Sequence, residues 1–133
     1  MSAMTDHPAH FLVKRIRSFG HALAGWLVAL RTEANFQVQA VAAVVAIGAS
    51  WYFDISPTEW LIVVLTIATV LAMELLNSAI ERLADWVQPA HDKQIKVIKD
   101  LAAGAVLLVA CAAAIVGLII FLPKIADALH SAS

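Results

Sequence analysis

The chain has 133 residues, of which 62% are hydrophobic and 14% are charged, and its formal net charge is −1. Soluble domains average about 45–50% apolar and about 25% charged residues, so this composition excludes an ordinary soluble domain, and it is too apolar for a disordered chain. A charge this close to zero gives no basic field, so no nucleic-acid partner is expected. The single cysteine, Cys111, excludes an intrachain disulfide framework and a cysteine-based zinc site. A small integral membrane protein remains.

The N-terminal third begins with residues 1–10, which contain no apolar segment of the kind a signal peptide needs and are expected to form a flexible tail. Residues 11–32 have apolar side chains at helical spacing, with basic residues mostly between them. This pattern predicts a basic amphipathic helix lying in the membrane surface. Gly20 and Gly25 each cost such a helix about 1 kcal/mol relative to alanine, so they indicate the close approach of another helix or of a ligand.

Three later segments are long and apolar enough to cross a membrane, since a spanning helix needs about 20 apolar residues. They are predicted at about residues 35–53, 58–80 and 101–122. Residues 54–57 (Asp-Ile-Ser-Pro) are typical of a turn, and Pro123 is expected to end the third span. We therefore expect an all-α membrane protein with three transmembrane helices and an N-terminal surface helix. These form a single domain over residues 11–125, followed by a tail at 126–133.

The distribution of lysine and arginine predicts the orientation, because cytoplasmic loops are enriched in both. Four precede the first span, none lies in the first loop, four are assigned to the second loop, including Arg82, and one follows the third span. The N-terminus and the second loop are therefore expected in the cytoplasm, in a multi-pass protein of the cytoplasmic membrane.

The second span carries polar side chains, and contact between such side chains and lipid is unfavourable. Glu74 lies within its apolar stretch, where an ionisable residue costs at least about 2.5–3.5 kcal/mol. At about 100° per residue, Glu81 and Asp85 both lie within about 20° of Glu74 on the helix surface. Asn77 and Ser78 flank them. One face of this helix is thus predicted to present three carboxylates, an amide and a hydroxyl.

Charged residues at the ends of the other two spans are expected at the same level of the membrane. They are Glu33, Lys99 and Asp100. Mg²⁺ takes oxygen ligands, usually one or two carboxylates plus substrate phosphates, so Glu33 and Glu81 are candidate metal ligands. Glu74 lies deepest, and an apolar surrounding makes a carboxylate hold a proton more readily, so it is a candidate general base for a lipid hydroxyl. Lysines can bind phosphate as point charges.

From these residues alone, three interpretations stay open. The polar face formed by Glu74, Asn77, Ser78, Glu81 and Asp85, called the polar stripe below, can join packed helices or carry ions. It can instead catalyse a reaction at the membrane surface. In the third interpretation the chain is an accessory subunit. The sequence has neither the phosphate-binding loop of soluble nucleotide hydrolases nor the motif set of soluble protein kinases. A nucleotide site would therefore be built from side chains and helix ends.

The stripe also carries a family resemblance. The run from Glu74 to Glu81 (ELLNSAIE) resembles the signature of the small prokaryotic diacylglycerol kinases, and Lys99-Asp100, eighteen residues later, resembles their second motif. Residues 31–37 resemble the segment that leads into the family's first span, and the likeness extends over about residues 11–125. Further pointers suggest the undecaprenol kinase branch of the family. These are Thr32-Glu33-x-Asn35-Phe36-Gln37, Glu59-Trp60 and residues 117–124.

The resemblance implies an ATP- and Mg²⁺-dependent kinase that phosphorylates a lipid alcohol, undecaprenol or diacylglycerol, at the cytoplasmic leaflet of the bacterial inner membrane. By position, Glu74 would accept the proton, Glu74 and Lys99 would bind the lipid substrate, and Glu33 and Glu81 would hold Mg²⁺. The implied nucleotide-binding residues are Lys14, His21, Glu33, Asn77, Glu81, Lys99 and Asp100. Lys14 and His21 fall where the family has an arginine and a tyrosine, so Lys14 keeps the charge but lacks the planar fork.

The resemblance further implies a homotrimer whose active sites combine groups from adjacent chains. Three spans of one chain can barely enclose a polar cavity, so neighbouring chains are the available cover for the stripe. The alternative outside the family is a non-enzymatic, small ion-conducting or transporter-accessory membrane protein.

Overall fold

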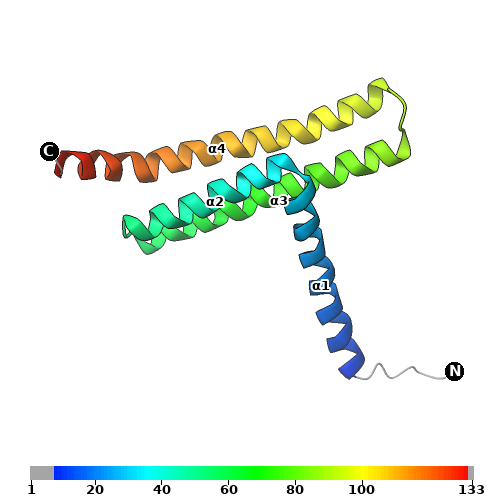
Figure 1. The fold of residues 1–133 in the computed structure, drawn as a ribbon, viewed down its shortest axis with the longest axis horizontal. Helices are drawn as coiled ribbons and strands as arrows, with labels where there is room; N and C mark the ends of the chain where they lie inside the picture. The colour runs from blue at the N-terminus through cyan, green and yellow to red at the C-terminus, as the bar shows by residue number, and fades with distance from the viewer. Residues whose placement is uncertain (1–7, 132–133) are drawn as a thin grey trace.

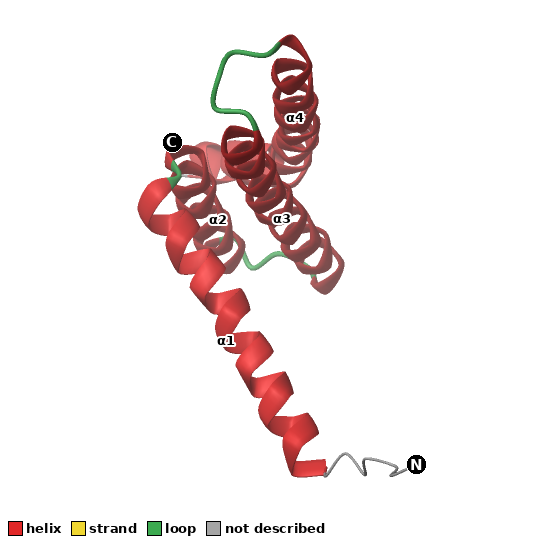
Figure 2. Cartoon of the chain, turned by 90° about the vertical axis from the view of Figure 1, so that its right-hand side faces the viewer, coloured by secondary structure: helices red, strands yellow, loops and turns green. Residues whose placement is uncertain are grey.

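The computed structural model of the protein describes residues 8–131, and within this range the chain is helical apart from short connections. The helices are α1 (Pro8–Thr32), α2 (Ala34–Tyr52), α3 (Pro57–Val87) and α4 (Lys93–Ser131). α3 packs against both α2 and α4, whereas α1 leaves this group in a steeply different direction (Figure 1). The connections between the helices are short (Figure 2). Residues 1–7 and 132–133, which belong to the two predicted tails, lie outside the described range.

The three predicted spans are confirmed as helices. α2, α3 and α4 are each long and apolar enough to cross a membrane by length and composition. Many of their apolar side chains are exposed, such as Val44 on α2 at 70% and Leu108 on α4 at 72%. Apolar surface on this scale is uncommon on soluble monomers and suits contact with lipid tails or with further chains.

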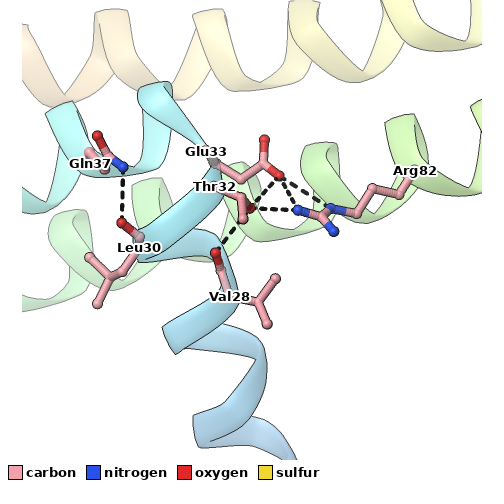
Figure 3. A network of polar contacts seen from close by, with 6 residues as sticks. All are labelled: Val28, Leu30, Thr32, Glu33, Gln37 and Arg82. Carbon is pink, nitrogen blue, oxygen red and sulfur yellow. Dashed lines mark hydrogen bonds and ion pairs between the residues drawn. The ribbon is translucent and has the colours of Figure 1, made fainter.

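A single non-helical residue, Glu33, joins α1 to α2. Its backbone is extended, with φ −106° and ψ 107°. Across this junction the Gln37 side-chain amide donates a 3.0 Å hydrogen bond to the carbonyl of Leu30 (Figure 3). Thr32 donates to the carbonyl of Val28 one turn earlier, also at 3.0 Å. The first of these hydrogen bonds spans the junction, and the Glu33 side chain points toward Arg82 of α3 (Figure 3).

The predicted turn between the first two spans is present, and its chemistry explains how α3 begins. Asp54 has a positive φ of 47°, which reverses the chain after α2. Ser56 caps α3 by accepting a hydrogen bond from the backbone N–H of Glu59, while the Glu59 carboxylate accepts one from the N–H of Ser56. Pro57 occupies the first helical turn, where no backbone N–H partner is needed. Next to this turn, an apolar cluster around Ile55 holds α3 and α4 together.

Several helices extend beyond the ends expected from the sequence, and α4 already begins at Lys93, before the predicted third span. α1 already begins at Pro8, inside the segment expected to be a tail. α3 continues beyond the predicted span to Val87, so Arg82, expected in the second loop between the spans, is helical. α4 does not end at Pro123 but continues to Ser131. A proline removes one backbone hydrogen bond, which ends many helices in water, but neighbouring groups compensate for this loss in membrane helices.

Candidate active site

α3 keeps one face toward its neighbours along its length, and that face changes from apolar to polar. Val63 and Val70 are buried near its start, and Glu74, Asn77 and Ser78 are buried further along. Spacings of three and four residues place all of these on one side of the helix. The predicted polar stripe therefore faces the interior of the fold at its deep end.

Glu74 is the most deeply buried member of the stripe, with 2% of its surface exposed. The Asn35 side chain of α2 lies close enough to interact with its carboxylate. Its Oε2 atom is buried and has no hydrogen-bond partner among the described residues. The negative charges of Glu81 and Glu33 both act on Glu74, so the three carboxylates predicted for the site are neighbours in space.

Asn77 and Glu81 form the next turn of the stripe. The side-chain amide of Asn77 donates a 3.0 Å hydrogen bond to Oε1 of Glu81. The Asn77 Oδ1 atom is buried and, within the described residues, accepts no hydrogen bond. Two buried oxygens, Glu74 Oε2 and Asn77 Oδ1, thus lie one turn apart on α3 without a donor. Such oxygens suit a hydroxyl donor or a hard cation.

No group of three or more histidine, cysteine, aspartate or glutamate side chains within the described part of the chain is placed to hold a metal ion. The charges of Glu33 and Glu81 both act on Glu74, but the three carboxylates do not form a closed metal cage. This openness is compatible with Mg²⁺, which usually keeps one or two protein carboxylates and completes its shell with substrate phosphates and water.

Glu33 is held by Arg82 of α3, a contact that sequence reasoning missed. Oε1 of Glu33 accepts hydrogen bonds from Nε of Arg82 at 3.2 Å and from its Nη2, and the same Nη2 lies 2.6 Å from the Thr32 hydroxyl (Figure 3). The hydrogen bond from Arg82 lowers the pKa of Glu33 below its usual value of 4.5. Glu33 is therefore ionised at neutral pH, and the contact weakens only as the pH falls through this lowered pKa.

A cavity of about 430 Å³ lies between α1 and α3 beside this contact. Its polar lining comes from His21, Glu33, Ser78 and Arg82. The volume is within the usual range of about 300–1,000 Å³ for small-molecule sites. Gly25 also lines the cavity, and a Cβ atom added there would meet no atom within 4 Å. Within the described chain, the space beside Gly25 is therefore open to a ligand.

The structure brings the remaining predicted residues only partly into this site. Lys99 forms an ion pair with Asp85 at 2.9 Å, and the charge of Glu81 also acts on it, so Lys99 lies near the exposed end of the stripe. Asp100 instead pairs with Lys96 on its own helix. Lys14 is exposed on α1 and does not line the cavity.

The sequence pattern of the family described as "Prokaryotic diacylglycerol kinase" matches residues 20–121. The chain belongs to this family. The matched range contains the polar stripe, the Glu33 junction and the Lys99-Asp100 pair, so the resemblance derived from those motifs is confirmed. The protein is a membrane lipid kinase, as predicted, and not the non-enzymatic channel or accessory subunit considered as the alternative.

Several characterised proteins are similar to the chain. An undecaprenol kinase of Bacillus subtilis (strain 168) is 42% identical over 109 residues, which cover 82% of this chain and 89% of that protein. A diacylglycerol kinase of Synechocystis sp. is 38% identical over 109 residues, covering 81% of this chain and 62% of that protein. A diacylglycerol kinase of Pseudomonas aeruginosa is 36% identical over 94 residues, which cover 70% of this chain and 76% of that protein.

Proposed function

We propose that this lipid kinase transfers the γ-phosphoryl group of ATP to the hydroxyl of a lipid alcohol at the cytoplasmic leaflet, with Glu74 as the general base. The buried Oε2 atom of Glu74, which has no donor among the described residues, carries this proposal. Leaving a buried carboxylate oxygen without a hydrogen bond is costly. A lipid hydroxyl that arrives from the membrane would supply the missing donor.

In the proposed reaction Glu74 accepts the proton of the lipid hydroxyl. The lipid oxygen forms a bond to the γ-phosphorus of ATP, and the bond between that phosphorus and the bridging oxygen of ADP breaks. ADP leaves with the bonding electron pair, and Glu74 later releases its proton to water. Its position beside Glu33 and Glu81 keeps the base next to the groups proposed to hold the nucleotide's metal.

Glu33 and Glu81 are the proposed Mg²⁺ ligands, and the donor set suits this ion. Both side chains offer carboxylate oxygens, and the Asn77 amide orients Glu81 through its 3.0 Å hydrogen bond. Mg²⁺, when bound, neutralises charge on the nucleotide phosphates. The proposed nucleotide contacts are Lys14, His21, Glu33, Asn77, Glu81, Lys99 and Asp100, of which His21 and Glu33 line the cavity between α1 and α3.

An apolar cavity of about 290 Å³ between α2, α3 and α4 supports a substrate with a hydrocarbon chain. Val70 and Leu71 line one end of it, within about one helical turn of Glu74, and Phe121 lines it near the far end of α4. A lipid tail placed here would bring its hydroxyl toward the base. Because an undecaprenol kinase is 42% identical to the chain over 109 residues, we propose undecaprenol as the first substrate to test.

Turnover of undecaprenol and diacylglycerol, measured side by side with radiolabelled ATP and Mg²⁺, tests this function. We expect label in the lipid phosphate fraction, with the higher kcat/KM for undecaprenol. Preference for diacylglycerol would contradict the substrate choice but keep the kinase mechanism. Absence of label from both lipids, together with proton flux in liposomes, would contradict the proposed reaction.

We also propose a homotrimer with its N-terminus in the cytoplasm. The largely exposed apolar faces of α2 and α4 support contact with further copies, and the lysine and arginine distribution supports this orientation. Completion of the site by a neighbouring chain would also account for Lys14 lying outside the cavity of its own chain. The mass of the purified protein in detergent and the protease sensitivity of either terminus in oriented vesicles test these two points.

Gly25 offers a test of the cavity itself. Replacing Gly25 with leucine is expected to fill the space beside α1 and to raise the KM for ATP about tenfold, since overfilling a site costs about 1–3 kcal/mol. Gly20→Leu is the matched control, because Gly20 lies on the same helix and does not line the cavity. Leucine favours a helix more than glycine does, so neither change should weaken α1. If the two variants have the same KM for ATP, the nucleotide does not bind in this cavity.

A further inference from the structure

The cavity between α1 and α3 holds one cation that the predicted nucleotide set leaves out. Among the described side chains that line this cavity, Arg82 alone carries a permanent positive charge. A nucleotide polyphosphate needs such charges close to its oxygens. Lys99, near the exposed end of the stripe, does not line this cavity and is paired with Asp85. We propose that Arg82 is a nucleotide-binding residue whose guanidinium contacts the polyphosphate. This inference rests on the proposed function of the cavity.

The geometry of Arg82 leaves room for this contact. Its bonds to Glu33 and Thr32 use Nε and Nη2 only, so they do not involve the two N–H groups of Nη1. The Arg82 side chain is 54% exposed. The planar guanidinium presents donors in several directions and suits phosphate oxygens better than an ammonium group does. Arg82 can therefore hold Glu33 and a phosphate oxygen at the same time.

The ion pair with Glu33 positions this guanidinium. It joins the α1–α2 junction to α3 across 49 residues of sequence, and both partners line the cavity. An exposed ion pair of this kind adds little to stability by itself. Its larger consequence is to place a cation next to a proposed metal ligand, where the phosphates of a metal-bound nucleotide would lie.

Binding measurements on the full-length protein in detergent test the proposal with Arg82→Gln and Arg82→Lys. The probes are a non-hydrolysable ATP analogue with Mg²⁺, and AMP. We expect Arg82→Gln to weaken binding of the analogue about 10- to 100-fold, as for loss of charge-assisted hydrogen bonds. AMP binding should change much less, because AMP lacks the β- and γ-phosphates. The affinity of Arg82→Lys for the analogue should lie between those of the wild type and Arg82→Gln, because lysine keeps the charge but lacks the planar guanidinium fork.

Arg31→Gln is the matched control. Arg31 lies in the last turn of α1, is exposed and does not line the cavity. Equal weakening by Arg31→Gln would indicate a general charge effect and overturn the proposal. Unchanged analogue binding in Arg82→Gln would also overturn it, as would an equal loss of AMP and analogue binding with a lower Tm, the result expected of a purely structural residue.

The kinetics separate this inference from the proposed function. Arg82→Gln should raise the KM for ATP more than it lowers kcat, and the KM for the lipid should stay the same. A wild-type protein that binds the analogue through Arg82 but labels no lipid would overturn the proposed reaction alone. A wild-type protein that labels lipid normally, with Arg82→Gln unaffected, would overturn the role of Arg82 alone.

Discussion

Glu74→Gln is expected to lower lipid turnover by about 10²–10⁴-fold, the usual contribution of a general base. Glutamine has nearly the same shape as glutamate and keeps a polar group beside Asn35, but it cannot accept the proton of the lipid hydroxyl. Nucleotide binding should remain largely intact, because Glu74 lies deeper than the proposed nucleotide groups. Steady-state turnover and equilibrium binding of a non-hydrolysable ATP analogue, measured on the same preparation, check both parts.

The control for Glu74→Gln is the same substitution at Glu59, on the opposite end of α3. Glu59 completes the helix cap, and its carboxylate lies 3.2 Å from the ammonium group of Lys124. Glutamine can still accept the capping hydrogen bond from the N–H of Ser56, so the change removes mainly an ion pair that adds little to stability. Turnover per folded molecule should stay unchanged. Full activity of Glu74→Gln would remove Glu74 as the base. Loss of activity in both variants would point to general damage to α3.

Glu81→Gln is expected to raise the Mg²⁺ concentration for half-maximal turnover by at least about tenfold. Removing even an outer partner of a metal ligand typically costs 10- to 100-fold in metal affinity, and a direct carboxylate ligand should cost no less. Glutamine can still accept the 3.0 Å hydrogen bond from Asn77, so the local packing of α3 is preserved. A Mg²⁺ titration of turnover at saturating ATP measures the shift.

Asp85→Asn serves as the comparison for Glu81→Gln. Asp85 lies one turn further along the same stripe, where its side chain is 65% exposed and pairs with Lys99. Removing its charge should leave the half-maximal Mg²⁺ concentration unchanged. If Glu81→Gln also leaves the titration unchanged, Glu81 is not a metal ligand. If both variants shift it equally, the effect comes from the charge of the stripe as a whole.

Much of the fold could be predicted because membrane helices are local structures. A run of about 20 apolar residues must form a helix to satisfy its backbone in hydrocarbon, and the Asp54 turn and the Ser56 cap act within a few residues of each other. Pro123 shows where local rules failed. In water it would be expected to end a helix, but α4 continues past it to Ser131.

The candidate site likewise has some features that local sequence predicts and others that depend on how the helices pack. The polar face of α3 follows from local sequence, because the helical period fixes which residues share one side. The alignment of Glu74, Asn77 and Glu81 therefore requires no tertiary information. The contact between Arg82 and Glu33, and the position of Arg82 beside His21 in the cavity, depend on the fold of the whole chain. Those residues lie on different helices, and their contact depends on how α1 and α2 meet α3, which no local pattern specifies.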